Sequence, residues 1–237
     1  MTTTAAPAVN LLERVRQHRA AIYAAKTVAG RTGGRRDIWP TAIIESAGDS
    51  LRDLVIREGA RRTLEVGTGL GLSSLAIVEG LLTVGGDVRH VTMDYGQARW
   101  DHAGEQALID SGADAVTTFM PKQSCVGLAQ LLEAGERFDL AFVDAGHQFD
   151  EAMVDLFFAL RLVKPNGLIV LDDHWMPSIQ TVLSFCITNW GLELELFDPK
   201  GPAARLVAMR NNGAAMKRPW DHFVPFSRAD LPAYAWR

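Results

Sequence analysis

The sequence is poor in cysteine, in long apolar runs and in excess charge of either sign. Its two cysteines, Cys125 and Cys186, lie far apart and form no C-x-x-C pair, so we expect reduced thiols and a cytoplasmic location. No apolar run approaches the ~20 residues that a membrane span needs. The first ten residues lack the charged start and hydrophobic run of a signal peptide, and we expect them to form a frayed tail.

The charge balance also limits the range of partners. A net charge of −4 gives no general attraction to nucleic acid, and the short basic clusters are typical of solvated surface. We therefore expect neither nucleic acid nor membrane as a partner. The length of 237 residues suits one α/β domain with a sizeable core. These bulk properties fit an enzyme with one such domain.

A glycine-rich segment is the most informative feature that is present. Residues 65–74 read Glu-Val-Gly-Thr-Gly-Leu-Gly-Leu-Ser-Ser and follow an apolar run, which predicts the end of a strand, a turn and the start of a helix. Glycines let the backbone approach a ligand, and a helix start offers free N–H groups. The segment predicts a nucleotide-type cofactor site made by Glu65, Gly67, Thr68, Gly69, Gly71, Ser73 and Ser74.

The spacing of these glycines narrows the choice of cofactor. A dinucleotide site has the pattern G-x-G-x-x-G, whose third position falls here on Leu72. The acid Glu65 would repel a pyrophosphate and suits a cationic ligand. An NAD site is therefore a distant alternative, and a tight turn that binds nothing is another.

Strand and helix patterns alternate along the chain. Helical spacing covers residues 11–29, 43–57, 72–82, 97–111, 125–134, 148–162 and 177–189, and strand patterns cover 63–66, 88–93, 115–120, 138–143 and 167–171. This alternation predicts a parallel sheet with the ligand at the carboxyl ends of its strands. Two further strands, Leu192–Phe197 and Ala204–Met209, joined by Asp198-Pro-Lys-Gly, predict a closing hairpin.

The pattern E/D-x-G-x-G-x-G with a closing hairpin resembles class I S-adenosylmethionine-dependent methyltransferases. The resemblance implies an α/β fold with a Rossmann-like seven-stranded sheet, parallel except for an antiparallel C-terminal hairpin strand, with helices on both faces. It implies that the acid holds the methionine amino group and that the glycines admit methionine and ribose. We divide the chain into an N-terminal helical extension (1–57), a cofactor-binding core (58–212) and an aromatic tail (213–237). The extension could cover the site or form a homodimer face, and the tail could be a lid, a dimer contact or a packed segment.

Two later positions add to the cofactor site. Asp94 ends the second predicted core strand, next to Tyr95, and can accept both ribose hydroxyls, although it could instead cap the following helix. Ser124 follows the third strand, where the resemblance implies a loop over the adenine; it could equally cap helix 125–134. The predicted cofactor set therefore also includes Asp94, Tyr95, Ser124 and Asp144.

Acids follow the fourth and fifth strands. Asp144 ends one strand, and Asp172 and Asp173 end the next. Neighbouring strands lie about 4.8 Å apart, so these carboxylates should meet, provided that the fifth strand has already turned into loop at Asp173. Three close carboxylates need a neutralising cation, and oxygen ligands suit Mg²⁺ or Ca²⁺, with Mn²⁺ as a further choice. We predict a metal site at Asp144, Asp172 and Asp173.

These acids resemble those of the catechol O-methyltransferase type, which has an Asp after strand four and an Asp-Asn pair after strand five. Its catalytic Lys stands three residues after the first Asp, where this chain has His147. The phrase V-D-A-G-H-Q-F-D-E also resembles a bacterial branch that includes natural-product methyltransferases. The resemblance implies methyl transfer to a hydroxyl of a natural-product-type small molecule, assisted by a divalent metal, with His147 as base and Asp144 and Asp173 in the catalytic set.

Other interpretations of the same residues remain open. His147 could be a hydrogen-bonding residue at a helix start, and the Asp172-Asp173 pair could form a turn and N-cap. The protein could be a metal-independent C- or N-methyltransferase of an aromatic ring that uses His147, His174 and Asp173. It could also be a cofactor-binding protein that does not methylate. Asp155 and the histidines other than His147 and His174 are given no role.

Overall fold

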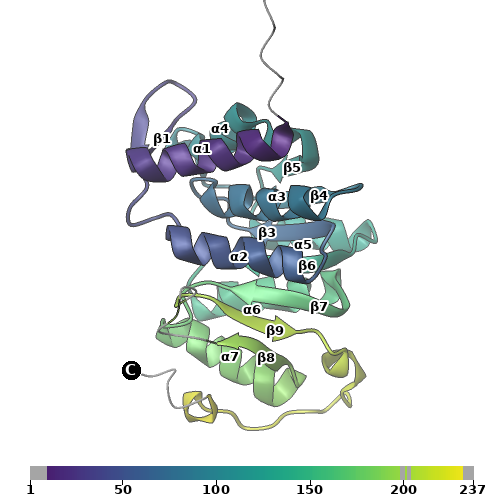
Figure 1. Cartoon of the computed structure of the whole chain (residues 1–237). Helices are drawn as coiled ribbons and strands as arrows, with labels where there is room; N and C mark the ends of the chain where they lie inside the picture. The colour runs from purple at the N-terminus through teal and green to yellow at the C-terminus, as the bar shows by residue number, and fades with distance from the viewer. Residues whose placement is uncertain (1–9, 198–200, 202–203, 232–237) are drawn as a thin grey trace, which may run out of the picture.

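A seven-stranded mixed sheet runs through the protein (Figure 1). The computed structural model describes residues 10–197, 201 and 204–231. In sheet order the strands are β5 (Thr117–Met120), β4 (Arg89–Met93), β3 (Arg62–Val66), β6 (Phe138–Val143), β7 (Val163–Leu171), β9 (Val207–Arg210) and β8 (Glu193–Phe197). β9 is antiparallel to both of its neighbours, and the pairs from β5 to β7 are parallel. The predicted fold class is confirmed.

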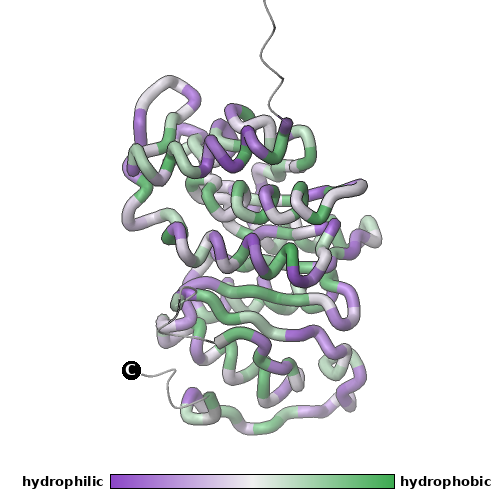
Figure 2. Tube along the Cα trace, in the orientation of Figure 1, coloured by the Kyte–Doolittle hydropathy of each residue, from purple (hydrophilic) through white to green (hydrophobic). Residues whose placement is uncertain are grey.

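Helices cover both faces of the sheet. Buried side chains form two clusters, one between the sheet and α1 (Leu11–Ala25), α2 (Glu45–Arg57), α3 (Leu72–Val84) and α4 (Ala103–Ser111), the other between the sheet and α5 (Ser124–Glu133), α6 (Phe149–Leu162) and α7 (Pro177–Trp190). Strands that are buried on both faces need apolar residues at nearly every position. Figure 2 shows this pattern along β7 and β9.

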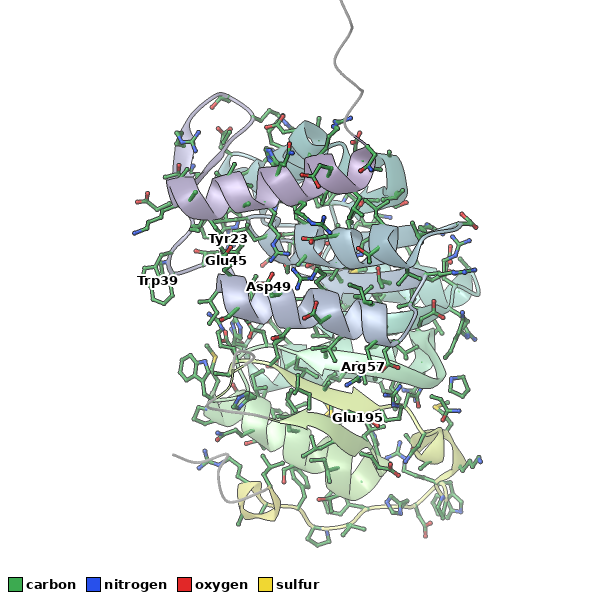
Figure 3. The ribbon with its side chains drawn as sticks, in the orientation of Figure 1. Tyr23, Trp39, Glu45, Asp49, Arg57 and Glu195 are labelled. Carbon is green, nitrogen blue, oxygen red and sulfur yellow. The ribbon has the colours of Figure 1, made fainter. Side chains whose placement is uncertain are left out.

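Buried charge fixes the N-terminal helices to the core. Arg19 of α1 pairs with Asp49 of α2 and with the buried Glu79 of α3, whose Oε2 lies 2.8 Å from the Arg19 Nη1. The Tyr23 hydroxyl donates to the Ile43 carbonyl at 2.9 Å. Figure 3 shows Tyr23, Glu45 and Asp49 gathered between α1 and α2. The extension therefore packs on the same face as α3 and α4.

Ion pairs also join α2 to the antiparallel edge. Arg210 of β9 binds Glu58, just after α2, with its Nη1 2.6 Å from the carboxylate, and its Nε lies 3.1 Å from Glu195 of β8. Arg57, at the end of α2, also lies near Glu195, with its Nη2 4.0 Å from that carboxylate (Figure 3). These contacts connect two parts of the chain that are more than 130 residues apart.

Two predicted helices differ in the structure. The first helix ends at Ala25 instead of continuing to residue 29, because the β-branched pair Thr27 and Val28 enters a short strand, β1 (Thr27–Ala29), which pairs with β2 (Arg35–Asp37). The predicted helix 97–111 is a short 3₁₀ helix (Gln97–Trp100) followed by α4, because Asp101 and His102 adopt left-handed backbone angles.

The C-terminal part packs against α7. The strand predicted at 204–209 begins at Val207, and residues 198–200 of the predicted turn lie outside the described residues. Short 3₁₀ helices occupy Ala214–Lys217 and Arg228–Asp230. Asn189 of α7 exchanges two hydrogen bonds with the backbone of Val224, at 2.8 and 2.9 Å. This part of the predicted tail therefore rests on the core. Within the described residues, no helix is long and apolar enough to cross a membrane.

Candidate functional site

A cleft of about 640 Å³ opens at the carboxyl ends of the parallel strands. This volume suits a ligand of nucleoside size. Nine predicted site residues line the cleft: Gly67, Thr68, Gly69, Ser73, Asp94, Tyr95, Ser124, Asp144 and His147. Five others do not: Glu65, Gly71, Ser74, Asp172 and Asp173. The predicted cofactor turn and the start of the predicted reaction site therefore share one cavity.

The glycine turn lies directly against the strand that carries Asp144. Gly67 has a φ of +96°, and a Cβ placed on it would lie 1.9 Å from the Asp144 carbonyl oxygen. The Asp144 N–H donates to the Val66 carbonyl at 2.9 Å. Gly69, two residues later, has a φ of +50° and open space where its Cβ would be. One glycine therefore allows close contact within the protein, and the other leaves room for a ligand.

Hydrogen bonds within the protein hold Asp94 in place. Its Oδ2 accepts hydrogen bonds from the Gly69 N–H at 3.0 Å and from the Gln97 side-chain amide at 2.7 Å. The same Gln97 amide donates to the Gly69 carbonyl at 2.7 Å, and the Gln97 Oε1 accepts from the N–H of Gly104. Gln97, which sequence reasoning missed, thus ties the turn to Asp94 and to the start of α4.

Glu65 lies beneath the turn and is fully buried. Its Oε2 accepts hydrogen bonds from Ser74 and, at 2.7 Å, from Thr92, and lies 3.1 Å from the His90 Nε2. Although burial opposes it, the hydrogen bond from His90 holds the pKa of Glu65 below its ordinary value. Side chains alternate along β3, so Glu65 points toward α3 while its neighbour Val66 lines the cleft. The placement gives Glu65 a part in holding the turn, and its contact with the methionine amino group stays a prediction.

Three side chains meet at the ends of β6 and β7. The His147 Nε2 lies 3.0 Å from an Asp173 oxygen and 3.6 Å from an Asp144 oxygen. Asp173 has a φ of +53°, so the chain has left the strand at this point, as the predicted convergence requires. We call Asp144, His147 and Asp173 the reactive cluster.

Asp172 takes no part in this cluster. Its carboxylate is paired with Arg205, whose Nη2 lies 2.8 Å from the Asp172 Oδ2 and 2.7 Å from the Asp173 Oδ1. The indole N–H of Trp175 also donates to Asp173, at 2.9 Å. Arg205 therefore neutralises the acid that the sequence prediction had given to a metal. Arg205 was missed because it lies more than 30 residues further along the chain.

The charges in the cluster shift one another's pKa. Hydrogen bonds to Asp144 and Asp173 raise the pKa of His147 to about 10, so its imidazole is protonated at neutral pH. Burial, with the charge of Asp173, raises the pKa of Asp144 despite the hydrogen bond from His147. Burial raises the pKa of Asp172 to about 7, helped by the charge of Asp144 and opposed by Arg205. Although burial opposes it, the hydrogen bond from His147 keeps the pKa of Asp173 below its ordinary value.

The reactive cluster also fits a divalent cation. Each of its members offers one ligand atom, and these atoms lie within 4.8 Å of one another. Two carboxylates and one imidazole form a mixed oxygen and nitrogen set, which suits a transition ion such as Mn²⁺ better than Mg²⁺. The donor set differs from the predicted one, because His147 takes the place of Asp172.

Other residues of the cleft were not predicted. They include Thr41, Ala42 and Ile43 ahead of α2, Arg99 and Trp100 of the 3₁₀ helix, and Asp155 of α6. These residues follow no local motif. Tertiary packing alone brings them to the mouth and floor of the cleft.

Comparisons with known proteins agree with this geometry. Residues 64–174 match the family model described as a methyltransferase domain. The O-methyltransferase ankF of Aspergillus thermomutatus is 31% identical over 121 residues, which make up 48% of this chain and 46% of that protein. The match therefore spans about half the length of that curated relative.

Solved structures extend the likeness of the fold to most of the chain. Cofactor-bound Rv0187 from MTB has a TM-score of 0.64 and 21% identity, and covers 84% of this chain and 89% of its own. The O-methyltransferase of Bacillus cereus in complex with SAH has a TM-score of 0.61 and 20% identity, and covers 86% of this chain and 92% of its own. Similarity at this level of identity shows a shared fold.

The chain therefore shares its fold with a solved O-methyltransferase, and residues 64–174 are similar to a methyltransferase domain.

Proposed function

We propose that this protein transfers a methyl group from S-adenosylmethionine to a hydroxyl of a small, natural-product-type molecule. The observation that carries the proposal is the shared cleft, in which the glycine turn and Asp94 lie at one part and Asp144 with His147 at another. A sulfonium held against the turn would present its methyl group toward the acids of the reactive cluster. Holding donor and acceptor in line supplies much of the rate in such a transfer.

Different residues of the cleft bind the cofactor and face the methyl group. Gly67, Thr68, Gly69 and Ser73 admit the methionine and ribose, and Asp94, held by Gln97, receives the ribose hydroxyls. Asp144, at the end of β6, borders the cleft where the methyl group would lie, and its negative charge attracts the sulfonium. His147 bridges Asp144 and Asp173 and keeps the two carboxylates from repelling each other.

The reactive cluster is our candidate for a metal site, with Asp144, His147 and Asp173 as the ligands. A divalent ion at this position would bind the substrate hydroxyl, lower its pKa and stabilise the oxyanion. On this route His147 is a metal ligand. We then expect the site to prefer a transition ion over the Mg²⁺ that the sequence predicted.

A metal-independent route is the second candidate, and Arg205 favours it. Its guanidinium already neutralises Asp172 and contacts Asp173, so the site carries an internal cation. His147 keeps its predicted role as the base on this route. Because the pKa of His147 is raised to about 10, the imidazole must first lose its own proton, which favours activity at alkaline pH. Methylation of an aromatic carbon or nitrogen also belongs to this route.

The remaining predictions are part of the proposal. The substrate is a small molecule, the compartment is the cytoplasm, and the chain is divided at residues 57/58 and 212/213. The N-terminal helices or the tail provide the contact of a homodimer.

Binding and turnover test the proposal separately. Titration calorimetry with S-adenosylhomocysteine should show one site per chain, and a methyltransfer screen over phenols and catechols should reveal a substrate. Activity that is lost on EDTA dialysis and restored by Mn²⁺ supports the metal-dependent route. Full activity after dialysis, rising with pH until His147 is deprotonated, supports the second. Tight binding of S-adenosylhomocysteine without transfer to any compound in the screen would favour a protein that binds the cofactor and does not methylate.

A further inference from the structure

Asp155 is a buried acid on the floor of the cleft that none of the roles above uses. It lies in the second turn of α6, has 1% of its surface exposed, and lines the same cavity as the glycine turn. It stands beside Ser124 at the start of α5, because α5 and α6 pack against each other. This position is away from the reactive cluster, on the β5 side of the cleft.

Among the residues that the structure describes, neither carboxylate oxygen of Asp155 has a hydrogen-bonding partner that meets ordinary distance and angle limits. Other buried acids are paired: Glu65 with His90, Glu79 with Arg19 and Asp172 with Arg205. A buried carboxylate without a hydrogen-bonding partner destabilises the folded protein, because its lost hydration is not replaced. A charge of this kind that faces a ligand cavity is explained if the ligand supplies the missing donor.

The surroundings of Asp155 match one edge of adenine. The first N–H groups of a helix have no partner within the helix, so the start of α5 at Ser124 offers donors. Asp155 offers acceptors beside them, and Met93 and Val154 line the cavity nearby with apolar surface. Adenine presents a donor, its exocyclic amine, next to an acceptor, its N1. Asp155 can therefore accept from the exocyclic amine, while an N–H group at the start of α5 donates to N1.

We propose that Asp155 accepts a hydrogen bond from the exocyclic amine of the adenine of S-adenosylmethionine and thereby makes the site selective for adenine over a 6-oxopurine. The inference rests on the proposed use of that cofactor and adds a residue that reads its base. A 6-oxopurine presents an acceptor where adenine has the amine, so it would place an oxygen against the carboxylate.

The ionisation of Asp155 agrees with this role. Burial raises the pKa of Asp155 to about 6, partly offset by the Ser124 hydroxyl, so the carboxylate is mostly ionised at neutral pH. An ionised acceptor makes a stronger hydrogen bond than a neutral one.

The test compares two ligands by titration calorimetry: S-adenosylhomocysteine and its 6-oxo analogue, S-inosylhomocysteine. We expect the wild type to prefer the adenine ligand by about 10- to 100-fold, the worth of one hydrogen bond to a charged group. In Asp155→Asn the preference should fall to within about threefold, because an amide can accept from the amine or donate to the oxo group. Urea unfolding of the free variant should show it at least as stable as the wild type, which excludes misfolding as the cause.

Glu151→Gln is the matched control. It removes the same charge from the same helix and the same cleft, but Glu151 lies against Gly146 near the reactive cluster. It should keep the ligand preference of the wild type. Equal binding of both ligands by the wild type, or an undiminished preference in Asp155→Asn, would overturn the role of Asp155 and leave the proposed function standing. If the wild type binds neither ligand, the proposed function fails and this inference fails with it.

Discussion

Replacement of Gly67 by alanine should destabilise the protein far more than the same change at Gly69. Both glycines have a positive φ, so each substitution carries a backbone cost of about 1–2 kcal/mol. Only at Gly67 does the new methyl group meet the protein, 1.9 Å from the Asp144 carbonyl oxygen. Real Cβ contacts are longer than 3.0 Å, so the end of β6 must move by about 1 Å.

The added clash costs about 1–3 kcal/mol, as does overpacking elsewhere in proteins. We therefore expect a total loss of about 2–5 kcal/mol in the free energy of unfolding for Gly67→Ala, against about 1–2 kcal/mol for Gly69→Ala. Urea denaturation without ligand measures both, and an unchanged m-value shows that only stability has changed. Equal losses in the two variants would refute the close contact between the turn and the strand of Asp144.

Three further outcomes follow from the charged groups. Arg205→Met should cost about 3–5 kcal/mol of unfolding free energy, because it leaves Asp172 buried without its cation. Adding Asp172→Asn should recover most of that loss in urea denaturation, and a double variant as unstable as the single one would count against the ion pair. Burial raises the pKa of Asp155 to about 6, above its value in the unfolded chain. The wild type should therefore lose up to about 3 kcal/mol of unfolding free energy relative to Asp155→Asn as the pH rises from about 4 to 6. If urea denaturation shows a constant difference in stability between the two proteins across this range, the burial argument is contradicted. The pKa of His147 is also raised, to about 10, but histidine carries its charge when it is protonated, so the pH dependence has the opposite origin. The stability that its ion pairs add is fully present below about pH 6.5 and is lost as the pH rises toward 10. The thermal midpoints of the wild type and His147→Gln, both measured in EDTA, should therefore converge between these two pH values.

The sequence predicted the conformation of the glycine-rich turn well because its signals are local. Gly67 and Gly69 do adopt positive φ, and the serines after them begin a helix, as a glycine-rich turn after an apolar strand requires. The alternation of strands and helices was likewise enough to predict the parallel sheet, and the two last strand patterns predicted the closing hairpin that contains the antiparallel strand β9. The short hairpin at Thr27–Asp37 was missed because three-residue strands carry almost no periodic signal.

The reactive cluster was predicted in part. The ends of β6 and β7 bring Asp144 and Asp173 together because neighbouring parallel strands finish at the same edge. The sequence could not show that Asp172 turns away to Arg205, or that His147 lies between the other two acids. Those choices depend on the left-handed turn at Asp173 and on a cation that comes from a distant part of the chain.

The sequence by itself determined the fold, the position of the turn and the strand ends that meet at the cleft, because hydrophobic periodicity and glycine act over a few residues. The tertiary structure decided the pairing of charges. It placed Arg205 against Asp172 and buried Asp155 at the cleft, where no described residue gives its carboxylate a hydrogen bond of ordinary geometry. Electrostatic partners are set by distance in space, and residues that are far apart in the sequence become neighbours only when helices and strands pack together.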